Sequence, residues 1–284
     1  PLTKKKYIVW PTYDFETVIG EEIAGVTHIL RSNEFGLMRV ELQNYIKDLL
    51  GFKKQDVIQY GRFNVIGAET QGRVIREMIE KKEVTGWDDP RLVTIMALRR
   101  RGIVPGTLHE LAIDVGLSST ETNLDWSMIA AINRKIIDPV TKRYFVVKKP
   151  KKIKIEHPLK TVDVPLHPQN KKLGKKHVAL GDTFYVSDPV EKGNVYRFMH
   201  MFNFKDGKFI SEEYDHSLGA KIIHAIPAHD ALDVRVLMND GSIIEGKGEK
   251  ALKELKDGEI VQFERMFFCR LDDKEKMLFV YAHP

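Results

Sequence analysis

The sequence is poor in cysteine, with Cys269 alone among 284 residues. One cysteine excludes an intrachain disulfide and any zinc site made only of cysteines, and it is the usage expected in a reducing cytoplasm. Long apolar runs are also absent. No stretch approaches the ~20 residues that a transmembrane helix needs. We therefore expect no membrane-spanning segment.

The familiar catalytic signatures are missing as well. There is no Ser–His–Asp signature, no phosphate-binding loop of the P-loop type and no His–Glu–x–x–His metal pair. Two acidic pairs, Asp88–Asp89 and Asp272–Asp273, are better explained as a helix cap and a turn than as metal ligands. We predict no metal-binding residue, and residue chemistry alone predicts no reaction.

The start of the chain, Pro1 to Lys6, is basic, but no apolar core follows it. A secretory signal peptide would have such a core, so we expect none here. Because the chain starts at Pro1 without a methionine, we expect it to be a fragment of a longer protein or to have lost its start.

Positive charge is concentrated in one region. The net charge is only +5, but the segment from Lys142 to Lys176 holds twelve Lys or Arg residues against two acids, Glu156 and Asp163. Such a block can be a solvated surface, or it can bind phosphates and release counterions. From the block alone both interpretations stay open.

Residues 1–82 alternate apolar strands with helices. The predicted strands are Tyr7–Trp10, Val26–Leu30 and Val57–Val65, and the main helices are Leu37–Leu50 and Arg73–Lys82. This alternation predicts a parallel α/β layer. Three strands make only a partial sheet, so we expect a strand from outside this chain to pair with its open edge.

The rest of the chain separates into helices and strands. Residues 83–138 predict three helices, the first running from Leu92 to Arg101 after a cap at Asp88 or Asp89 with Pro90 in its first turn. Residues 139–284 alternate throughout, and the predicted strands include Thr183–Val186, Val195–Phe204, Leu232–Leu237 and Val261–Arg270, with turn signals such as Asp240–Gly241. Regularly spaced strands over this length predict closed β-barrels, two in number.

Several segments resemble the class I glutamyl- and glutaminyl-tRNA synthetases. Pro11–Phe15 and Gly25–Phe35 resemble the second half of that family's catalytic domain. Arg62–Val65 and Gly86–Leu92 are similar to the segments that flank its KMSKS loop. The resemblance is ordered and continues along the whole chain.

Later segments extend the resemblance to the anticodon-binding region. Asn133–Pro139 resembles the approach to the family's anticodon-binding barrels, and Val261–Arg265 matches a later barrel segment. The β-barrel ending, with Ala282–His283, resembles the archaeal glutamyl-type enzyme.

The resemblance implies a multi-domain protein, α/β followed by all-β. Residues 1–82 would be the second half of a Rossmann-like catalytic domain with a degenerate KMSKS loop. Residues 83–138 would form a helical stem-contact region, and residues 139–284 two anticodon-binding β-barrels. The implied reaction attaches glutamate to tRNA(Glu) through a glutamyl adenylate made from ATP, with Mg²⁺ accompanying ATP. The family's first half, which carries the HIGH motif, is absent from this sequence and would be a partner.

The KMSKS loop departs from the family pattern. It falls at Thr70–Arg73, where Gly72 stands in place of the second lysine and Arg73 alone keeps a positive charge. Cations at this place stabilise charge that develops on the phosphates. Two interpretations follow. Either the chain is the C-terminal half of a glutamyl-tRNA synthetase, inactive alone, or it is a catalytically inactive synthetase-like module or subunit that binds tRNA.

The resemblance also assigns candidate site residues. Tyr13 would line the amino-acid pocket, although a core aromatic explains it equally well. Arg62 and Arg73 would bind ATP, with Arg73 in the catalytic role. Since Arg62 follows Gly61 in a strand, burying it without a partner would be costly, which favours a functional role.

The remaining candidates would contact tRNA. Asp88 and Arg91 would approach the acceptor arm, and Arg134, Gln262 and Arg265 would face the anticodon. Gln262 alternates with its apolar neighbours and therefore projects from the opposite face of its strand, where bases can reach it. The simpler interpretation is an exposed strand residue.

Overall fold

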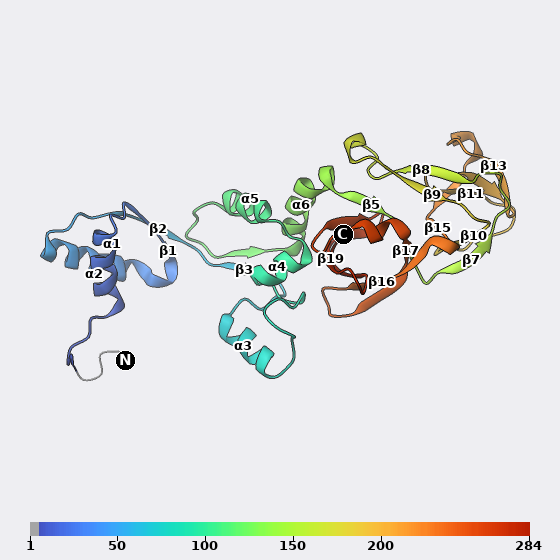
Figure 1. Ribbon diagram of the computed structural model, residues 1–284. Coiled ribbons are helices and arrows are strands. Elements are labelled where there is room, and N and C mark those ends of the chain that lie inside the picture. The colour runs from blue at the N-terminus through green and yellow to red at the C-terminus, as the bar shows by residue number, and fades with distance from the viewer. Residues whose placement is uncertain (1–5) are drawn as a thin grey trace. The chain divides into compact units, whose positions relative to one another are not determined.

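The computed structural model describes residues 6–284 (Figure 1). Contacts between residues divide the chain into two compact units. Unit 1 comprises Pro1–Ile66 and Leu111–Asp125, and unit 2 comprises Gly67–Glu110 and Trp126–Pro284. Within residues 6–284, no helix combines the length and the apolar character that crossing a bilayer requires.

Unit 1 contains the small parallel α/β arrangement that the alternation predicted. The strands β1 and β2 pair in parallel, with Ile29 opposite Val57, and α2 ends at Gly51, whose positive φ closes the helix. A second parallel pair joins β3 to β4. The elements of this unit are α1 (Tyr13–Ile23), β1 (His28–Ser32), η1 (Asn33–Phe35), α2 (Gly36–Leu50), β2 (Asp56–Tyr60), β3 (Phe63–Val65) and β4 (Thr122–Leu124).

The predicted strand Tyr7–Trp10 is wrong. This segment has no regular structure, and Ile8 and Val9 are 97% and 85% exposed. A strand needs a neighbour that accepts and donates its backbone hydrogen bonds. Among the residues described, no strand pairs with this segment.

The predicted strand Val57–Val65 is also wrong, because it is two strands with different partners. The chain breaks at Gly61, whose N–H donates to Ser118 O at 2.7 Å. A Cβ at Gly61 would lie 1.9 Å from Thr120 O, so only glycine allows this close approach. As a result, β2 pairs with β1 before this interruption, and β3 pairs with β4 after it.

Unit 2 begins with short helices packed around a small core of Ile75, Val84, Leu92 and Ala97. Two helices contribute to this core, α3 (Gly72–Glu80) and α4 (Ile95–Arg101). Unit 2 also contains α6 (Trp126–Ile137), and α5 (Pro105–Val115) starts in unit 2 and ends in unit 1.

The predicted acidic cap of the first helix is wrong. The cap of α4 is Thr94, whose hydroxyl accepts from Ala97 N at 3.0 Å. Asp89 instead accepts hydrogen bonds from Thr85 and Arg91 in the loop before the helix. The helix therefore starts later than the apolar periodicity indicates.

After Ile137 the described chain contains strands and short 3₁₀ turns but no α-helix, so the chain is mixed α/β with a β-rich second part, as predicted. The largest sheet has seven strands in the order β5–β18–β19–β20–β16–β17–β6. Its strands are β5 (Lys142–Tyr144), β6 (Val146–Lys148), β16 (Ala231–Leu237), β17 (Ile243–Glu249), β18 (Ile260–Phe263), β19 (Phe267–Asp273) and β20 (Leu278–His283).

The closed barrels that the sequence predicted are not found in the described part of the chain, because the hydrogen-bonded order of this sheet is open. Its two edge strands, β5 and β6, are nevertheless consecutive in the chain and are separated only by Phe145. The chain pairs with β18 before Phe145 and with β17 after it.

The segment from Tyr144 to Val147 contributes to two cores. Tyr144 and Val146 belong to the core of the seven-stranded sheet, whereas Phe145 and Val147 belong to a second core. This follows from the alternation of side chains along an extended segment. The second core contains a cluster of fully buried aromatic rings, including Phe184 and Phe198, whose centroids are 4.8 Å apart.

Three smaller sheets surround the second core, with the orders β15–β10–β7, β13–β12–β11–β14 and β8–β9. Their strands are β7 (Lys151–Lys154), β8 (Thr161–Pro165), β9 (Lys175–Ala179), β10 (Thr183–Val186), β11 (Val195–Phe198), β12 (Asn203–Lys205), β13 (Lys208–Ser211), β14 (Lys221–Ile223) and β15 (Ala225–Pro227).

Two of the long predicted strands are wrong, because each is a hairpin of two antiparallel strands. They are Val195–Phe204, which contains β11 and β12, and Val261–Arg270, which contains parts of β18 and β19. Their turns place His200 and Arg265 at positive φ, 62° and 58°. Tight turns with positive φ usually contain glycine or asparagine, so the sequence did not mark either turn.

Candidate nucleic-acid interface

The structure brings together the three residues assigned to the anticodon. Arg134, in the last turn of α6, Gln262 on β18 and Arg265 in the following turn all line one cavity of about 270 Å³. Although Arg134 and Gln262 are 128 positions apart in the sequence, the pairing of β5 with β18 brings the end of α6 close to this strand.

Gln262 lies as its alternation predicted. Val261 and Phe263 are buried in the core of the seven-stranded sheet, and Gln262 points to the other side, into the cavity. Its Oε1 atom is buried and has no hydrogen-bond partner among the described residues. Such an unpaired atom costs about 1–3 kcal/mol, so a ligand that donates a hydrogen bond here would relieve that cost.

Arg143 is a residue of this cavity that the sequence did not reveal. It lies directly opposite Gln262 across the parallel pair β5–β18 and lines the same cavity. Asp138 accepts from its guanidinium at 3.1 Å, but its buried Nε has no partner within residues 6–284. The cavity is therefore lined by two residues at paired positions that each have an unpaired buried atom, the donor Nε of Arg143 and the acceptor Oε1 of Gln262.

Arg265 occupies a strained position. The turn from Phe263 to Met266 is closed by the hydrogen bond from Met266 N to Phe263 O at 2.9 Å, and Arg265 has a φ of 58°. This conformation costs a residue other than glycine on the order of 1–3 kcal/mol, and such strain clusters at functional sites. The guanidinium donates to Ile222 O at 3.3 Å.

A second cavity, of about 400 Å³, adjoins the first and shares Arg265 and Met266 with it. His224 lines it and stacks on Phe145, with ring centroids 4.8 Å apart. Burial lowers the pKa of His224 to about 4, so the ring is neutral at physiological pH. Lys148 and Lys221 supply positive charge at the same cavity.

These two cavities have the properties that unpaired nucleotides require. Single-stranded bases are recognised by stacking and by hydrogen bonds to their edges, and their phosphates are bound by cations. The first cavity offers guanidinium groups and an amide, and the second a neutral imidazole with lysines.

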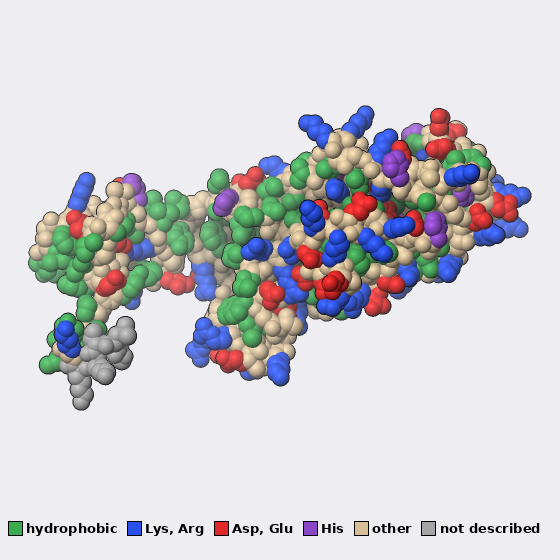
Figure 2. All heavy atoms as spheres, viewed as in Figure 1, with side chains coloured by type: hydrophobic (Ala, Val, Ile, Leu, Met, Phe, Trp, Pro, Cys, Tyr) green, Lys and Arg blue, Asp and Glu red, His purple; other side chains and the backbone are tan. Residues whose placement is uncertain are grey.

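The basic segment from Lys142 to Lys176 is mostly exposed. Eight of its twelve basic side chains are exposed: Lys149, Lys151, Lys152, Lys154, Lys160, Lys171, Lys172 and Lys175. Figure 2 shows Lys and Arg side chains over the β-rich part of unit 2, including the tip of the β8–β9 hairpin. Exposed cations of this kind are available to phosphates.

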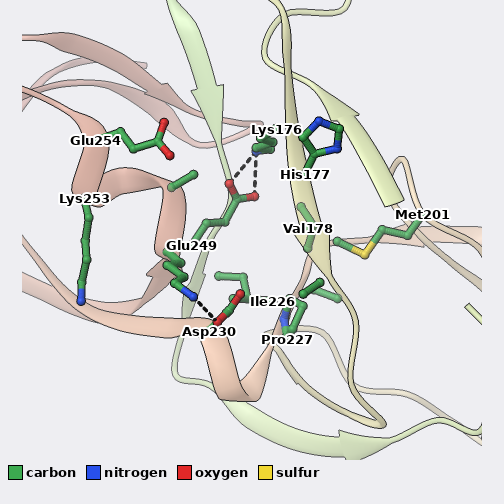
Figure 3. A pocket seen from close by; sticks show the side chains of 14 residues that line it. Lys176, His177, Val178, Met201, Ile226, Pro227, Asp230, Glu249, Lys253 and Glu254 are labelled. Carbon is green, nitrogen blue, oxygen red and sulfur yellow. Dashed lines mark hydrogen bonds and ion pairs between the residues drawn. The ribbon is translucent and has the colours of Figure 1, made fainter. Parts of the chain in front are cut away.

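Lys176 is the one basic side chain of this segment that is buried, and it pairs with Glu249. Its Nζ donates to the two carboxylate oxygens at 2.8 and 2.6 Å (Figure 3). The pair lines a cavity of about 440 Å³ in which Lys250 also pairs with Asp230, at 3.0 Å. Because these charges neutralise one another, we assign this cavity no ligand, and Lys176 is not available to a phosphate.

Asp88 and Arg91, assigned to the acceptor arm, line neither cavity of the candidate interface. Asp88 accepts from Arg100 at 3.2 Å, and Arg91 donates two hydrogen bonds to Asp89, both at 2.8 Å. Burial alone would raise the pKa of Asp89, but hydrogen bonds from Arg91 and Thr85 outweigh it and lower the pKa far below its usual value. Contact of these residues with tRNA remains a prediction.

The residues assigned to catalysis lie in different units. In unit 1, Tyr13 is 57% exposed, so it is not a core aromatic, and it stacks on Phe35 with centroids 6.0 Å apart. Arg62 pairs with Glu34 at 3.6 Å in the same unit. In unit 2, Arg73 is an exposed residue of the first turn of α3 and pairs with Glu77 at 3.3 Å.

Comparison with known protein families gives matches along almost the whole chain. The profile described as "tRNA synthetases class I (E and Q), catalytic domain" matches residues 1–139. Two profiles described as "tRNA synthetases class I (E and Q), anti-codon binding domain" match residues 141–224 and 208–272.

The chain is also similar to archaeal glutamate–tRNA ligases. It is 37% identical to that of Pyrococcus abyssi over 303 residues, covering 100% of this chain and 53% of the relative. It is 34% identical to that of Methanocaldococcus jannaschii over 297 residues, covering 100% and 54%. The chain thus spans about half the length of these curated relatives.

Proposed function

We propose that this chain is the C-terminal part of a cytoplasmic glutamyl-tRNA synthetase, because it belongs to the tRNA synthetases of class I (E and Q). Combined with an N-terminal half that carries the HIGH motif, it would attach glutamate to tRNA(Glu) through an ATP-derived glutamyl adenylate. The order of the family matches, catalytic domain first and anticodon-binding domain after it, supports the C-terminal position.

The observation that carries this proposal is the convergence of Arg134, Gln262 and Arg265 on one cavity. An anticodon base that leaves the stack would enter this cavity and present its edge to the Gln262 amide. The exposed lysines of the basic segment would hold the surrounding phosphates. In this division of labour, phosphate contacts supply affinity and base contacts supply selectivity.

The proposed domains are residues 1–82 for the catalytic half, 83–138 for the stem-contact region and 139–284 for two anticodon-binding barrels. Two separate cores in the β-rich part support two barrels. The position of β5 and β6 at opposite edges of one sheet, with only Phe145 between them in the chain, supports a barrel-like closure of the first.

An exposed apolar surface in unit 1 supports the N-terminal half as a partner. Leu30 of β1 is 53% exposed and Ile58 of β2 is 36% exposed, on the same face of the two-stranded parallel sheet. Parallel sheets are normally covered on both faces. We propose that the HIGH-bearing half covers this face and extends the sheet.

In the assembled enzyme, Tyr13 would line the glutamate pocket, and Arg62 and Arg73 would bind ATP. Arg73 would stabilise the negative charge that develops as pyrophosphate leaves. Within residues 6–284, no three acidic, histidine or cysteine side chains are grouped to hold a metal ion. We propose that Mg²⁺ accompanies ATP.

Glutamate-dependent ATP–pyrophosphate exchange tests the proposal. The chain alone should show no exchange above background, and adding the HIGH-bearing half of an archaeal relative should produce it. If the assembled pair binds tRNA(Glu) but stays inactive, the alternative holds. In that case the chain is a synthetase-like module that only binds tRNA. Gly72, in place of the second KMSKS lysine, favours that alternative.

A further inference from the structure

Asn133 is a fully buried amide on α6 that uses both of its ends. Its Oδ1 accepts from Val104 N at 3.0 Å and from Thr107 Oγ1 at 2.7 Å. Its Nδ2 donates to Gly102 O at 3.2 Å and to His283 Nε2 at 2.9 Å. An amide with two acceptor and two donor bonds is fully satisfied, so its orientation is fixed.

His283, on β20, is equally buried and has a defined role for each ring nitrogen. Its Nδ1 donates to Pro284 O at 3.1 Å, which leaves Nε2 as the acceptor for Asn133; this tautomer is assigned from the hydrogen bonds. Burial lowers the pKa of His283, which keeps the ring neutral.

The strand register connects His283 to the cavity. Gln262 on β18 lies opposite Phe268 on β19, and Phe268 lies opposite His283 on β20. The rings of Phe268 and His283 are in contact, with centroids 5.1 Å apart. His283 therefore stands in the same row across the sheet as Gln262.

A second connection runs through the neighbours of the two residues. Arg134 follows Asn133 in the chain, and its Nη2 donates to the carbonyl oxygen of Pro284, which follows His283. The hydrogen bond between Asn133 and His283 thus lies one residue away from the Arg134–Pro284 contact on both segments. Arg134 and Pro284 both line the first cavity.

We infer that Asn133 and His283 are positioning residues that hold Arg134 in place relative to Gln262 for recognition of an unpaired base. The inference rests on the proposed function, because it requires Arg134 and Gln262 to contact the anticodon. An arginine held in its binding geometry loses less side-chain entropy when the base enters. Neither positioning residue lines the cavity itself.

The test measures Kd for a tRNA(Glu) transcript and for a transcript with one anticodon base replaced. In His283→Phe, which keeps a ring but removes the acceptor, we expect roughly tenfold weaker binding of tRNA(Glu) and little change for the replaced transcript. His283→Gln retains an acceptor and should stay within about threefold of the original chain. His216→Phe, at an exposed histidine, is the matched control.

The double variant Arg134→Ala/His283→Phe gives the readout that a structural role would not produce. If His283 acts through Arg134, the double variant binds tRNA(Glu) as Arg134→Ala does, because neighbours in one network are not additive. Two results would overturn this inference but leave the proposed function standing. One is full additivity of the two substitutions in tRNA(Glu) binding, and the other is that His283→Phe weakens binding of both transcripts equally. If His283→Phe does not fold, His283→Met takes its place.

Two other outcomes separate this inference from its premise. A chain that binds both transcripts equally refutes anticodon recognition, and with it the proposed function and the inference. A chain that discriminates between the transcripts equally well with and without Arg134 refutes the cavity assignment and the inference, but leaves tRNA recognition standing.

Discussion

Arg100 on α4 holds Asp272 on β19 with three hydrogen bonds, from Nη2 at 2.8 Å and from Nε at 3.2 Å to each carboxylate oxygen. The same guanidinium reaches Asp88 at 3.2 Å. This contact joins the helical part of unit 2 to the seven-stranded sheet. It also shows that the two acidic pairs noted in the sequence share one arginine.

Replacing both partners of this contact should reveal a coupling. Arg100 and Asp272 are partly buried, so we expect an interaction free energy of about 1–2 kcal/mol in a double-mutant cycle of Arg100→Ala and Asp272→Ala. Urea unfolding of the four proteins measures it. Strict additivity of the two single effects would show that the ion pair contributes nothing to stability.

Arg265→Gly should separate binding from stability. Glycine adopts a φ of 58° without strain, so the unfolding free energy should rise or change by less than about 1 kcal/mol. Preference for tRNA(Glu) over other tRNAs should fall, because the guanidinium is lost from both cavities. Thermal unfolding and filter binding provide the two measurements. A clear loss of stability, or unchanged preference, would contradict this prediction.

Lysine and glutamine variants should affect tRNA binding differently. Replacing Lys148, Lys149, Lys151 and Lys152 with Ala should weaken binding of all tRNAs and flatten its salt dependence. Gln262→Ala should cost on the order of 1–3 kcal/mol on tRNA(Glu) and little on other tRNAs. Filter binding across a salt series shows both effects. Equal weakening of every tRNA by Gln262→Ala would place that residue away from the anticodon.

His224 should make the stability depend on pH. Its pKa of about 4 in the folded chain lies below the ordinary value of 6.5, so the folded state binds fewer protons. The contribution of neutral His224 to the free energy of unfolding is therefore fully present above pH ~6.5. It is lost as the pH falls toward 4, and the total loss is roughly 3 kcal/mol. In His224→Phe, urea midpoints between pH 7.5 and 4.5 should vary less than in the original chain. An identical pH profile would exclude His224 as the source.

Gly61→Ala should destabilise unit 1. The added Cβ would lie 1.9 Å from the backbone oxygen of Thr120, so β3 or β4 must shift, at a cost of about 1–3 kcal/mol. Gly20→Ala is the matched control, because its Cβ would meet only Glu16 Oε1 at an ordinary 3.6 Å; in a helix this change should stabilise by about 0.5–1 kcal/mol. Equal melting temperatures for the two variants would rule out the predicted clash.

The architecture was predictable where local signals agree with the tertiary structure. The alternation predicted β10 and most of β16 because each strand buries one face, and Asp240–Gly241 marked the turn between β16 and β17. The hairpins at His200 and Arg265 were not predictable, because neither turn has the glycine that normally marks it.

The candidate site was predictable only in part. The resemblance identified Gln262, and strand alternation predicted the face from which it projects, but neither revealed Arg143. Its place in the cavity depends on the register between β5 and β18, segments more than 110 residues apart in the chain. Nothing local in a sequence encodes such a register.

The segment Tyr144–Val147 has a consequence for how the β-rich part unfolds. Its side chains alternate between two cores, so neither core can lose this segment without exposing part of the other. The two cores should therefore melt in one calorimetric transition. A one-residue deletion within the segment would exchange the side chains that the two cores receive, which makes this stretch the least tolerant of insertions and deletions in the β-rich part of the chain.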